Sequence, residues 1–150
     1  MTECHYLAID LAKNVFQLHG AAADGSVVFR RRLTREQLSA FVVQLPPCEI
    51  AMEACASAHH WARQFTAMGH RVRLISPQFV KPFVKGNKND GNDAEAICEA
   101  MQRPNMRFVP IKTVEQQDVQ SLHRIRARLV NERTGLVCQI RGILAERGIV

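Results

Sequence analysis

The segment from Glu49 to Ser76 constrains the fold more than any other part of the sequence. It contains two short apolar runs, EIAMEA and RVRLIS, separated by the helix-type run SAHHWARQFTAMG. Ser57 stands at the cap position of this helix and Gly69 at its stop position. Two strands joined by a helix at this spacing are expected to be parallel, with the helix packed on one face of the sheet. The segment therefore predicts an α/β fold.

The residues before this segment predict an antiparallel meander. Three β-type runs, HYLAIDLA, VFQLHGAAA and SVVFRRRL, follow one another, and the turn dipeptide Asp24-Gly25 separates the last two. Thr34 then begins the helical run TREQLSAFVVQL, in which Gln37 occupies the capping-box position. A meander that leads into a parallel portion predicts a mixed sheet with flanking helices.

The residues after Pro77 predict a connector, a short helix and one long helix. PQFVKPFVKG is expected to be an apolar and basic connector, and a helix is expected to begin between residues 89 and 92. Val114 to about Arg147 contains no proline and has apolar residues at seven-residue spacing: Leu122, Leu129, Leu136 and Ile143. A helix of this length exceeds what so small a domain can cover, so we expect part of it to pack on another chain or a further domain.

Composition narrows the possible partners and the compartment. The chain has 150 residues, the size of one ordinary domain, and a net charge of +6, which favours an anionic partner such as nucleic acid. The basic excess is concentrated from Arg103 onward, where nine Lys and Arg face four Asp and Glu. The five cysteines form no CxxC pair and are expected to be free and mostly buried. Without a signal sequence or a membrane-spanning run, a cytoplasmic protein is expected.

Two carboxylates interrupt strands that otherwise look buried. Asp10 ends the apolar run YLAID, and Glu53 ends IAME. A buried unpaired carboxylate costs several kcal/mol, so each side chain should be hydrogen-bonded, ion-paired or bound to a cation. Ligands of open α/β sheets collect at the carboxyl ends of the parallel strands. If the two strands are neighbours, the two acids meet at that edge.

Asp90 and Asp93 can join this pair from the start of the next helix. Residues three apart share a helix face, so both aspartates could point toward the same sheet edge. Four converging carboxylates repel one another when no cation is bound between them, but they suit hard divalent cations such as Mg²⁺ or Mn²⁺. Two such ions about 4 Å apart can stabilise both oxygens of an in-line phosphoryl displacement. The pattern therefore favours phosphodiester chemistry on nucleic acid.

Each of these acids also has a purely structural interpretation. Asp90, or Asn92 with Glu95 at its capping-box position, could simply cap the helix. Asp10 could lie in a hairpin turn paired with Lys13, and Glu53 could be a strand-end acid held by Arg71 or His59. Cys55, two residues beyond Glu53, has no identifiable base and is expected to be a small buried side chain, not a nucleophile.

Basic residues near the acids and on the long helix are candidates for phosphate contacts. Lys81, Lys85 and Lys88 lead into the acidic pair, and Arg124, Arg126 and Arg128 belong to the long helix. Such side chains can neutralise a nucleic-acid backbone. The alternative for both groups is an ordinary solvated surface.

Several blocks of the sequence together resemble one known family. YLAIDLAKN, AMEACASAHHWARQF, GHRVRLISPQFVKPFVKGNKNDGNDAEAICEA and LHRIRARLVNERT are similar to the amino-terminal half of the DEDD-type insertion-sequence transposases, the insertion-sequence one-hundred-and-ten family. The resemblance covers nearly the whole chain. It implies a ribonuclease H-like (RuvC-like) fold over residues 1–112, followed by a long amphipathic helix over 113–150 that could serve oligomerisation.

The resemblance also implies an activity and a metal site. It carries over a catalytic, metal-binding tetrad of Asp10, Glu53, Asp90 and Asp93 with Mg²⁺ or Mn²⁺, in an enzyme that cuts and joins DNA during transposition. Bridge RNA as a guide, DNA as substrate and a homo-oligomer belong to the same expectation. The family's carboxyl-terminal, serine-bearing domain is expected to be absent from this chain. Ala56 departs from the family, which often has glycine shortly after the glutamate.

Two other functions stay open from the sequence. One is a stand-alone nuclease of the same fold that cuts Holliday-type junctions. The other is a non-catalytic remnant that binds nucleic acid and dimerises but no longer holds metal.

Overall fold

The computed structural model describes residues 3–84 and 90–150, without the side chains of residues 90 and 91. One sheet of six strands has the order β3-β2-β1-β4-β5-β6. The strands are β1 (Tyr6–Asp10), β2 (Val15–Ala21), β3 (Val27–Thr34), β4 (Glu49–Glu53), β5 (Arg71–Ile75) and β6 (Phe108–Val109). The helices are α1 (Arg35–Val42), α2 (Ala58–Ala67), α3 (Pro77–Val80), the 3₁₀ turn η1 (Lys81–Phe83), α4 (Asp90–Met101) and α5 (Val114–Ala145).

The strand pairings confirm the predicted mixed sheet. β1, β2 and β3 pair antiparallel, whereas β4 pairs parallel with both β1 and β5. β6 adds an antiparallel edge to β5. The sequence did not predict β6, because a strand of two residues is too short to show alternation. The parallel centre places the carboxyl ends of β1 and β4 at one edge of the sheet.

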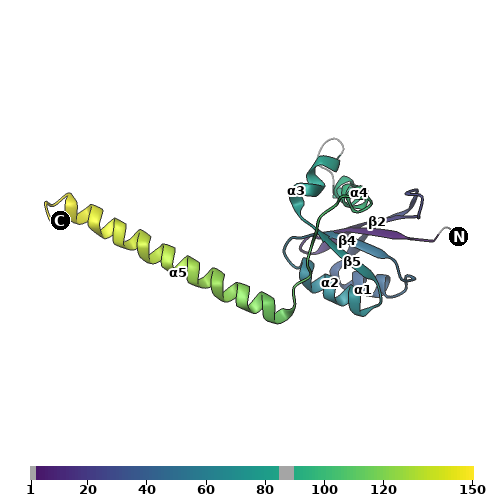
Figure 1. Ribbon diagram of the computed structural model, residues 1–150, viewed down its shortest axis with the longest axis horizontal. Coiled ribbons are helices and arrows are strands. Elements are labelled where there is room, and N and C mark those ends of the chain that lie inside the picture. Colours follow the sequence, from purple (N-terminus) through teal and green to yellow (C-terminus); the bar gives the residue numbers. More distant parts are fainter. Residues whose placement is uncertain (1–2, 85–89) are drawn as a thin grey trace. The chain divides into compact units, whose positions relative to one another are not determined.

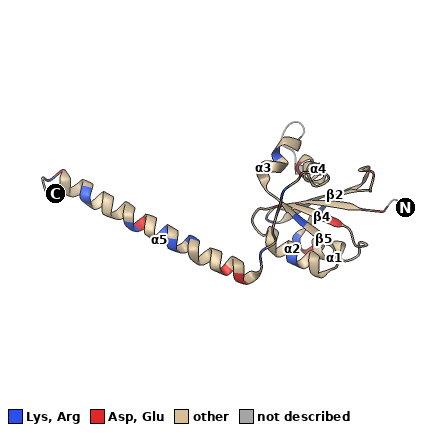
Figure 2. Cartoon of the chain, viewed as in Figure 1, with Lys and Arg blue, Asp and Glu red and all other residues tan. Residues whose placement is uncertain are grey.

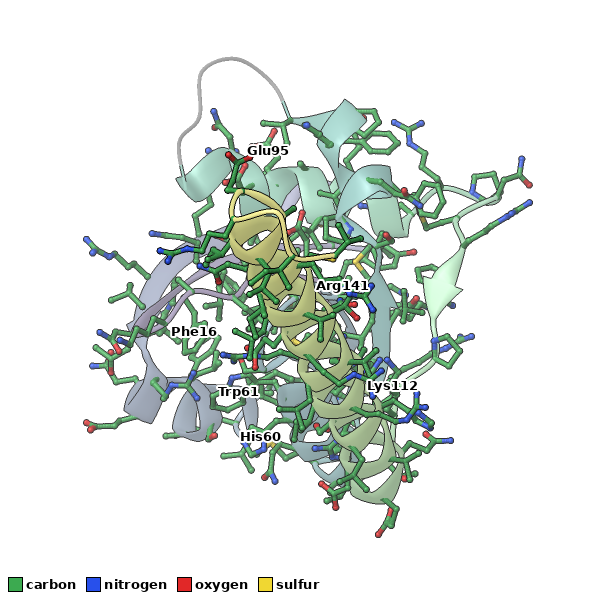
Figure 3. The ribbon with its side chains drawn as sticks, turned by 90° about the vertical axis from the view of Figure 1, so that its left-hand side faces the viewer. Phe16, His60, Trp61, Glu95, Lys112 and Arg141 are labelled. Carbon is green, nitrogen blue, oxygen red and sulfur yellow. The ribbon has the colours of Figure 1, made fainter. Side chains whose placement is uncertain are left out.

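One face of the sheet carries the larger core, beneath α1 and α2 (Figure 1). The Phe16 and Trp61 rings meet edge to face with centroids 5.6 Å apart, and Trp61 stacks on Phe65 at 5.5 Å. Figure 3 shows Phe16 and Trp61 together on this side of the sheet. Gly20 belongs to this face, where a β-carbon would come within 2.5 Å of the Phe29 ring. Large apolar side chains therefore fix α1 and α2 on the sheet.

The opposite face is built from smaller side chains and is covered by α3 and α4 (Figure 1). Ala8, Ala21 and Ala51 supply its sheet side, and Ala96 and Ile97 supply part of its helix side. All five are almost fully buried. Because alanine projects little from the sheet, the α4 backbone can approach the strands closely.

The helix ends confirm some predicted signals and contradict others. Thr34 forms the predicted capping box with Gln37, and Gly69 ends α2 in the left-handed region at φ +93°. Ser57 also precedes its helix, but it has a φ of 69° and its side chain makes no capping hydrogen bond. Ser57 therefore occupies the predicted N-cap position of α2 but does not cap the helix through its side chain. The predicted connector after Ser76 is wrong in part, since Pro77–Phe83 forms α3 and η1.

Residues 112–150 form a second compact unit that consists mainly of α5. A capping box between Thr113 and Gln116 begins this helix. Val114–Ala145 is one continuous helix, as the absence of proline and the apolar repeat predicted. None of its residues is buried, and Leu122, Leu129, Leu136 and Ile143 expose 67%, 58%, 57% and 53% of their surface. The described residues include no helix that is both long enough and apolar enough to span a membrane.

The cysteines agree with the sequence prediction. All five are free, and Cys4, Cys48 and Cys98 are buried. Cys55 is half-buried and Cys138, on α5, is exposed.

Candidate acidic site at the sheet edge

Asp10 and Glu53 are the last residues of β1 and β4, two parallel neighbours. The register pairs Ile9 with Met52, so Asp10 and Glu53 follow side by side one residue further on. Ile9 and Met52 point into the larger core, and Ala8 and Ala51 into the smaller one. Because side chains alternate along a strand, both acids lie on the face that α4 covers.

Asp93 reaches the same edge from the first turns of α4. The pKa of Glu53 is raised above its ordinary value, first by burial and then by the negative charges of Asp10 and Asp93. This electrostatic influence means that three acids from separate elements share one neighbourhood. Asp90 is the first residue of α4, but its side chain lies outside the described part of the structure.

The donors at this edge are all carboxylate oxygens, the ligands that hard divalent cations prefer. A cation among them would offset the repulsion that, after burial, raises the pKa of Glu53. Among the side chains that the structure describes, which exclude that of Asp90, no three His, Cys, Asp or Glu residues form a group that could hold a metal ion. The donor type therefore suits Mg²⁺ or Mn²⁺, although the described side chains do not form a ready-made ligand group.

The structural alternatives for the strand acids can now be compared with the geometry. Asp10 lies within β1, opposite Gln17 of β2, and so belongs to the strand and not to the turn. Arg71 pairs in register with Glu49, at the other end of β4 from Glu53, and Arg73 forms an ion pair with the same Glu49.

Cys55 does not have the environment of an activated nucleophile. Its pKa is raised by burial and by the charges of Glu53 and Asp10, so the protonated thiol is favoured. The side chain packs against the larger core. Cys55 is therefore a half-buried packing residue beside the acids.

The predicted phosphate-binding lysines and arginines fall in different places. Lys81 lies exposed in η1, just before the residues that lead into α4, whereas Lys85 and Lys88 lie outside the described residues. Arg124, Arg126 and Arg128 are exposed on α5, and Figure 2 shows basic positions recurring along this helix. Arg128 donates to Glu132 at 2.7 Å, so it already has a protein partner.

Three consecutive arginines on β3 were not singled out from the sequence. Arg30, Arg31 and Arg32 are exposed on the edge strand of the sheet. Arg30 donates to Glu95 of α4 at 2.5 Å, and Arg31 lies over the Phe41 ring at 5.0 Å from its centroid. The run of three arginines in SVVFRRRL is the signal that could have marked them as an anionic-ligand surface.

The sheet order and its two helix layers define a RuvC-like, ribonuclease H-like fold. The RuvC of Thermus thermophilus in complex with a Holliday junction substrate superposes with a TM-score of 0.50, covering 69% of this chain and 98% of that chain. A second Thermus thermophilus RuvC structure gives the same TM-score over 69% of this chain and 99% of its own length. Identities of 12% and 14% make this a likeness of fold alone.

The chain belongs to the DEDD transposases of the IS110 type, because that family's model, described as "Transposase", matches residues 7–148. A "Probable family 20 transposase" of Pseudomonas aeruginosa is 59% identical over 96% of this chain and 43% of its own length. A "Transposase for insertion sequence element IS1111A" of Coxiella burnetii is 53% identical over 99% of this chain and 41% of its own. The chain thus spans about two fifths of the length of these relatives.

Proposed function

We propose that this chain supplies the metal-dependent, strand-cleaving site of an insertion-sequence transposase. Asp10, Glu53, Asp90 and Asp93 are the proposed ligands of Mg²⁺ or Mn²⁺, and DNA is the proposed substrate. The single observation that carries the proposal is that Asp10 and Glu53 end the adjacent parallel strands β1 and β4, on the sheet face that α4 covers.

The chain's own residues would hold and orient the reacting groups. In this proposal the paired strands β1 and β4 keep Asp10 and Glu53 side by side, and α4, packed on the small-residue core, would carry Asp93 toward them. The bound cations would supply charge stabilisation to the attacking and leaving oxygens of the phosphodiester.

The whole protein is proposed to act in the cytoplasm as a DNA recombinase, guided by an element-encoded RNA. Support for the guide RNA comes from the family alone. Support for a homo-oligomer comes from α5, whose apolar residues at seven-residue spacing are more than half exposed. Residues 1–112 are the proposed catalytic domain and 113–150 the proposed oligomerisation segment, with a serine-bearing domain proposed for the rest of the intact protein.

Calorimetric titration of the 150-residue chain with Mn²⁺ tests the metal site. We expect measurable binding heat in the unaltered protein and its loss in Asp10→Asn and Asp93→Asn. Glu36→Gln is the matched control, because Glu36 is an exposed acid on α1, in the layer on the other face of the sheet. Absence of heat in the unaltered protein would instead favour the non-catalytic remnant.

Cleavage assays on the intact protein test the reaction. With Mg²⁺, target DNA and guide RNA, we expect Asp10→Asn to reduce strand cleavage by at least about a hundredfold, since removal of one group acting on transition-state charge has effects of this size. A four-way DNA junction without RNA is the comparison substrate. Efficient cutting of that junction alone would identify a junction nuclease and overturn the transposase proposal.

A further inference from the structure

The strand register places an arginine on the same cross-strand row as the candidate acids. Gln17 of β2 pairs with Asp10 on one side and with Arg32 of β3 on the other. Residues that pair directly across a sheet point to the same face. The row therefore runs Arg32, Gln17, Asp10 and then Glu53, across four adjacent strands.

The contacts of the neighbouring arginines establish which face Arg32 occupies. Arg30, two residues earlier, reaches Glu95 on α4, so it points to the face of the acids. Arg31 points the other way, over the Phe29 and Phe41 rings beside the larger core. Because side chains alternate along a strand, Arg32 lies on the α4 face, as do Asp10 and Glu53.

Arg32 differs from its neighbours in that its side chain has no partner among the described residues. Arg30 is paired with Glu95, and Arg31 lies over aromatic rings. The Arg32 side chain is exposed and makes neither a hydrogen bond nor an ion pair with any residue that the structure describes. The two strand spacings between β3 and β1 put its Cα about 9.6 Å from that of Asp10. Gln17 lies between the two on the same face, so a ligand that reaches both Arg32 and the acids must lie across the Gln17 side chain.

A phosphodiester is the ligand whose chemistry fits the Arg32 guanidinium beside the acids. The phosphates of a nucleic-acid strand are negatively charged, so the three carboxylates repel them. Cations bound by the acids would offset this repulsion at the phosphate that is cleaved. A neighbouring phosphate needs a separate positive group, and the planar guanidinium binds phosphate oxygens in a bidentate manner. An edge strand also leaves this side chain accessible from outside the sheet.

We propose that Arg32 binds a backbone phosphate next to the one that is cleaved and so holds the DNA strand across the acidic edge. This proposal rests on the proposed function, since it takes the acidic edge as the site of cleavage. Arg32 would act on every sequence alike, because phosphate contacts position a strand without reading its bases.

Three variants of the 150-residue chain test the proposal: Arg32→Gln, Arg32→Lys and Arg31→Gln. Arg31→Gln is the matched control, because it removes the same charge from the adjacent residue on the opposite face. Binding of a fluorescein-labelled DNA duplex is followed by anisotropy at several salt concentrations in the presence of Mn²⁺. Thermal melting verifies that each variant is folded.

We expect Arg32→Gln to bind about tenfold more weakly, the loss typical of one charge-assisted hydrogen bond. The slope of log affinity against log salt should fall by about 0.9, as for one lost phosphate contact. Arg32→Lys should bind more weakly but keep the slope of log affinity against log salt, because lysine retains the positive charge but lacks the paired N–H donors of the guanidinium. Arg31→Gln should change affinity by less than about twofold, as expected for a side chain on the other face.

Equal losses in Arg31→Gln and Arg32→Gln, or an unchanged slope in Arg32→Gln, would overturn the proposal. Mn²⁺ calorimetry on the same proteins separates this outcome from failure of the acidic site. Arg32→Gln should retain the binding heat of the unaltered chain. If the unaltered chain gives no heat while Arg32→Gln still loses DNA affinity, the metal site fails and the phosphate contact stands.

Discussion

The two faces of the sheet differ in the size and charge of the side chains that they present. The face beneath α1 and α2 has Phe16, Trp61 and Phe65 at its centre and buries large apolar groups. The α4 face has alanines beneath the helix and charged residues around them. Large side chains on the first face bury more apolar area and so contribute more to stability. Small side chains on the second face let a helix carrying acids approach strands that end in acids.

This difference explains how one sheet can be stable and still hold repelling charges. The pKa of Glu53 is raised first by burial and then by the charges of Asp10 and Asp93, so keeping this acid ionised on the α4 face has a cost. The larger core on the opposite face does not involve those acids and can offset that cost. Stability and the candidate site therefore depend on different residues, which substitutions can separate.

The largest expected effect is on the free energy of unfolding, when an aromatic ring is removed from the larger core beneath α1 and α2. Phe65 is fully buried and stacks on Trp61. Phe65→Ala should lower the free energy of unfolding by about 3–5 kcal/mol, since it removes buried area and leaves a cavity. Urea unfolding measures the change. Phe79→Ala is the control, because Phe79 is 36% exposed and should cost much less; similar losses in both variants would contradict the assigned core.

The next largest effect is expected from a larger side chain between α4 and the strands that it packs on. Ala51 is fully buried in the core beneath this helix. Ala51→Leu should cost about 1–3 kcal/mol by overpacking and should weaken Mn²⁺ binding, because α4 carries Asp93 away from the strands. Unfolding and calorimetry are measured together. Ala67→Leu, at an exposed position of α2, should change neither quantity, and unaltered Mn²⁺ binding in Ala51→Leu would refute the role given to small residues.

A smaller effect is expected from the charge of Glu53. Its folded-state pKa is raised above the ordinary value of 4.5, so folding favours the protonated form. The stability that this group contributes is present below pH 4.5 and is lost as the pH rises through the folded pKa. In metal-free buffer, Glu53→Gln should therefore gain stability over the unaltered protein as the pH rises. Unfolding at a series of pH values measures this difference, and a gap that does not grow with pH would be inconsistent with the raised pKa.

The smallest effect concerns the exposed ion pair beside the site. Arg30 and Glu95 expose 59% and 34% of their side chains, so solvent screens their attraction. Arg30→Gln should destabilise the chain by less than about 1 kcal/mol. A double-mutant cycle with Glu95→Gln isolates the pair, and 0.5 M salt should reduce the coupling further. A coupling free energy between Arg30 and Glu95 well above 1 kcal/mol would contradict this prediction and would mean that the ion pair stabilises the packing of α4.

Much of the fold was accessible from local patterns. The turn at Asp24-Gly25, the capping box at Thr34 and the stop at Gly69 are signals within a few residues, and each lies where it was expected. Ser57 shows the limit of such signals, because its backbone adopts a left-handed conformation that the residue type does not reveal. The two-residue strand β6 forms only because β5 is there to pair with it.

The sequence by itself determined that acids end two strands and begin a helix, because these positions follow from apolar runs and their interruption. Only the tertiary structure decided that Asp10 and Glu53 share a face, that α4 brings Asp93 to them, and that Arg32 stands on their row. Register and helix placement depend on pairings between residues far apart in the chain. A shift of one residue in a strand would turn each of its side chains to the other face, and no local pattern fixes that choice alone.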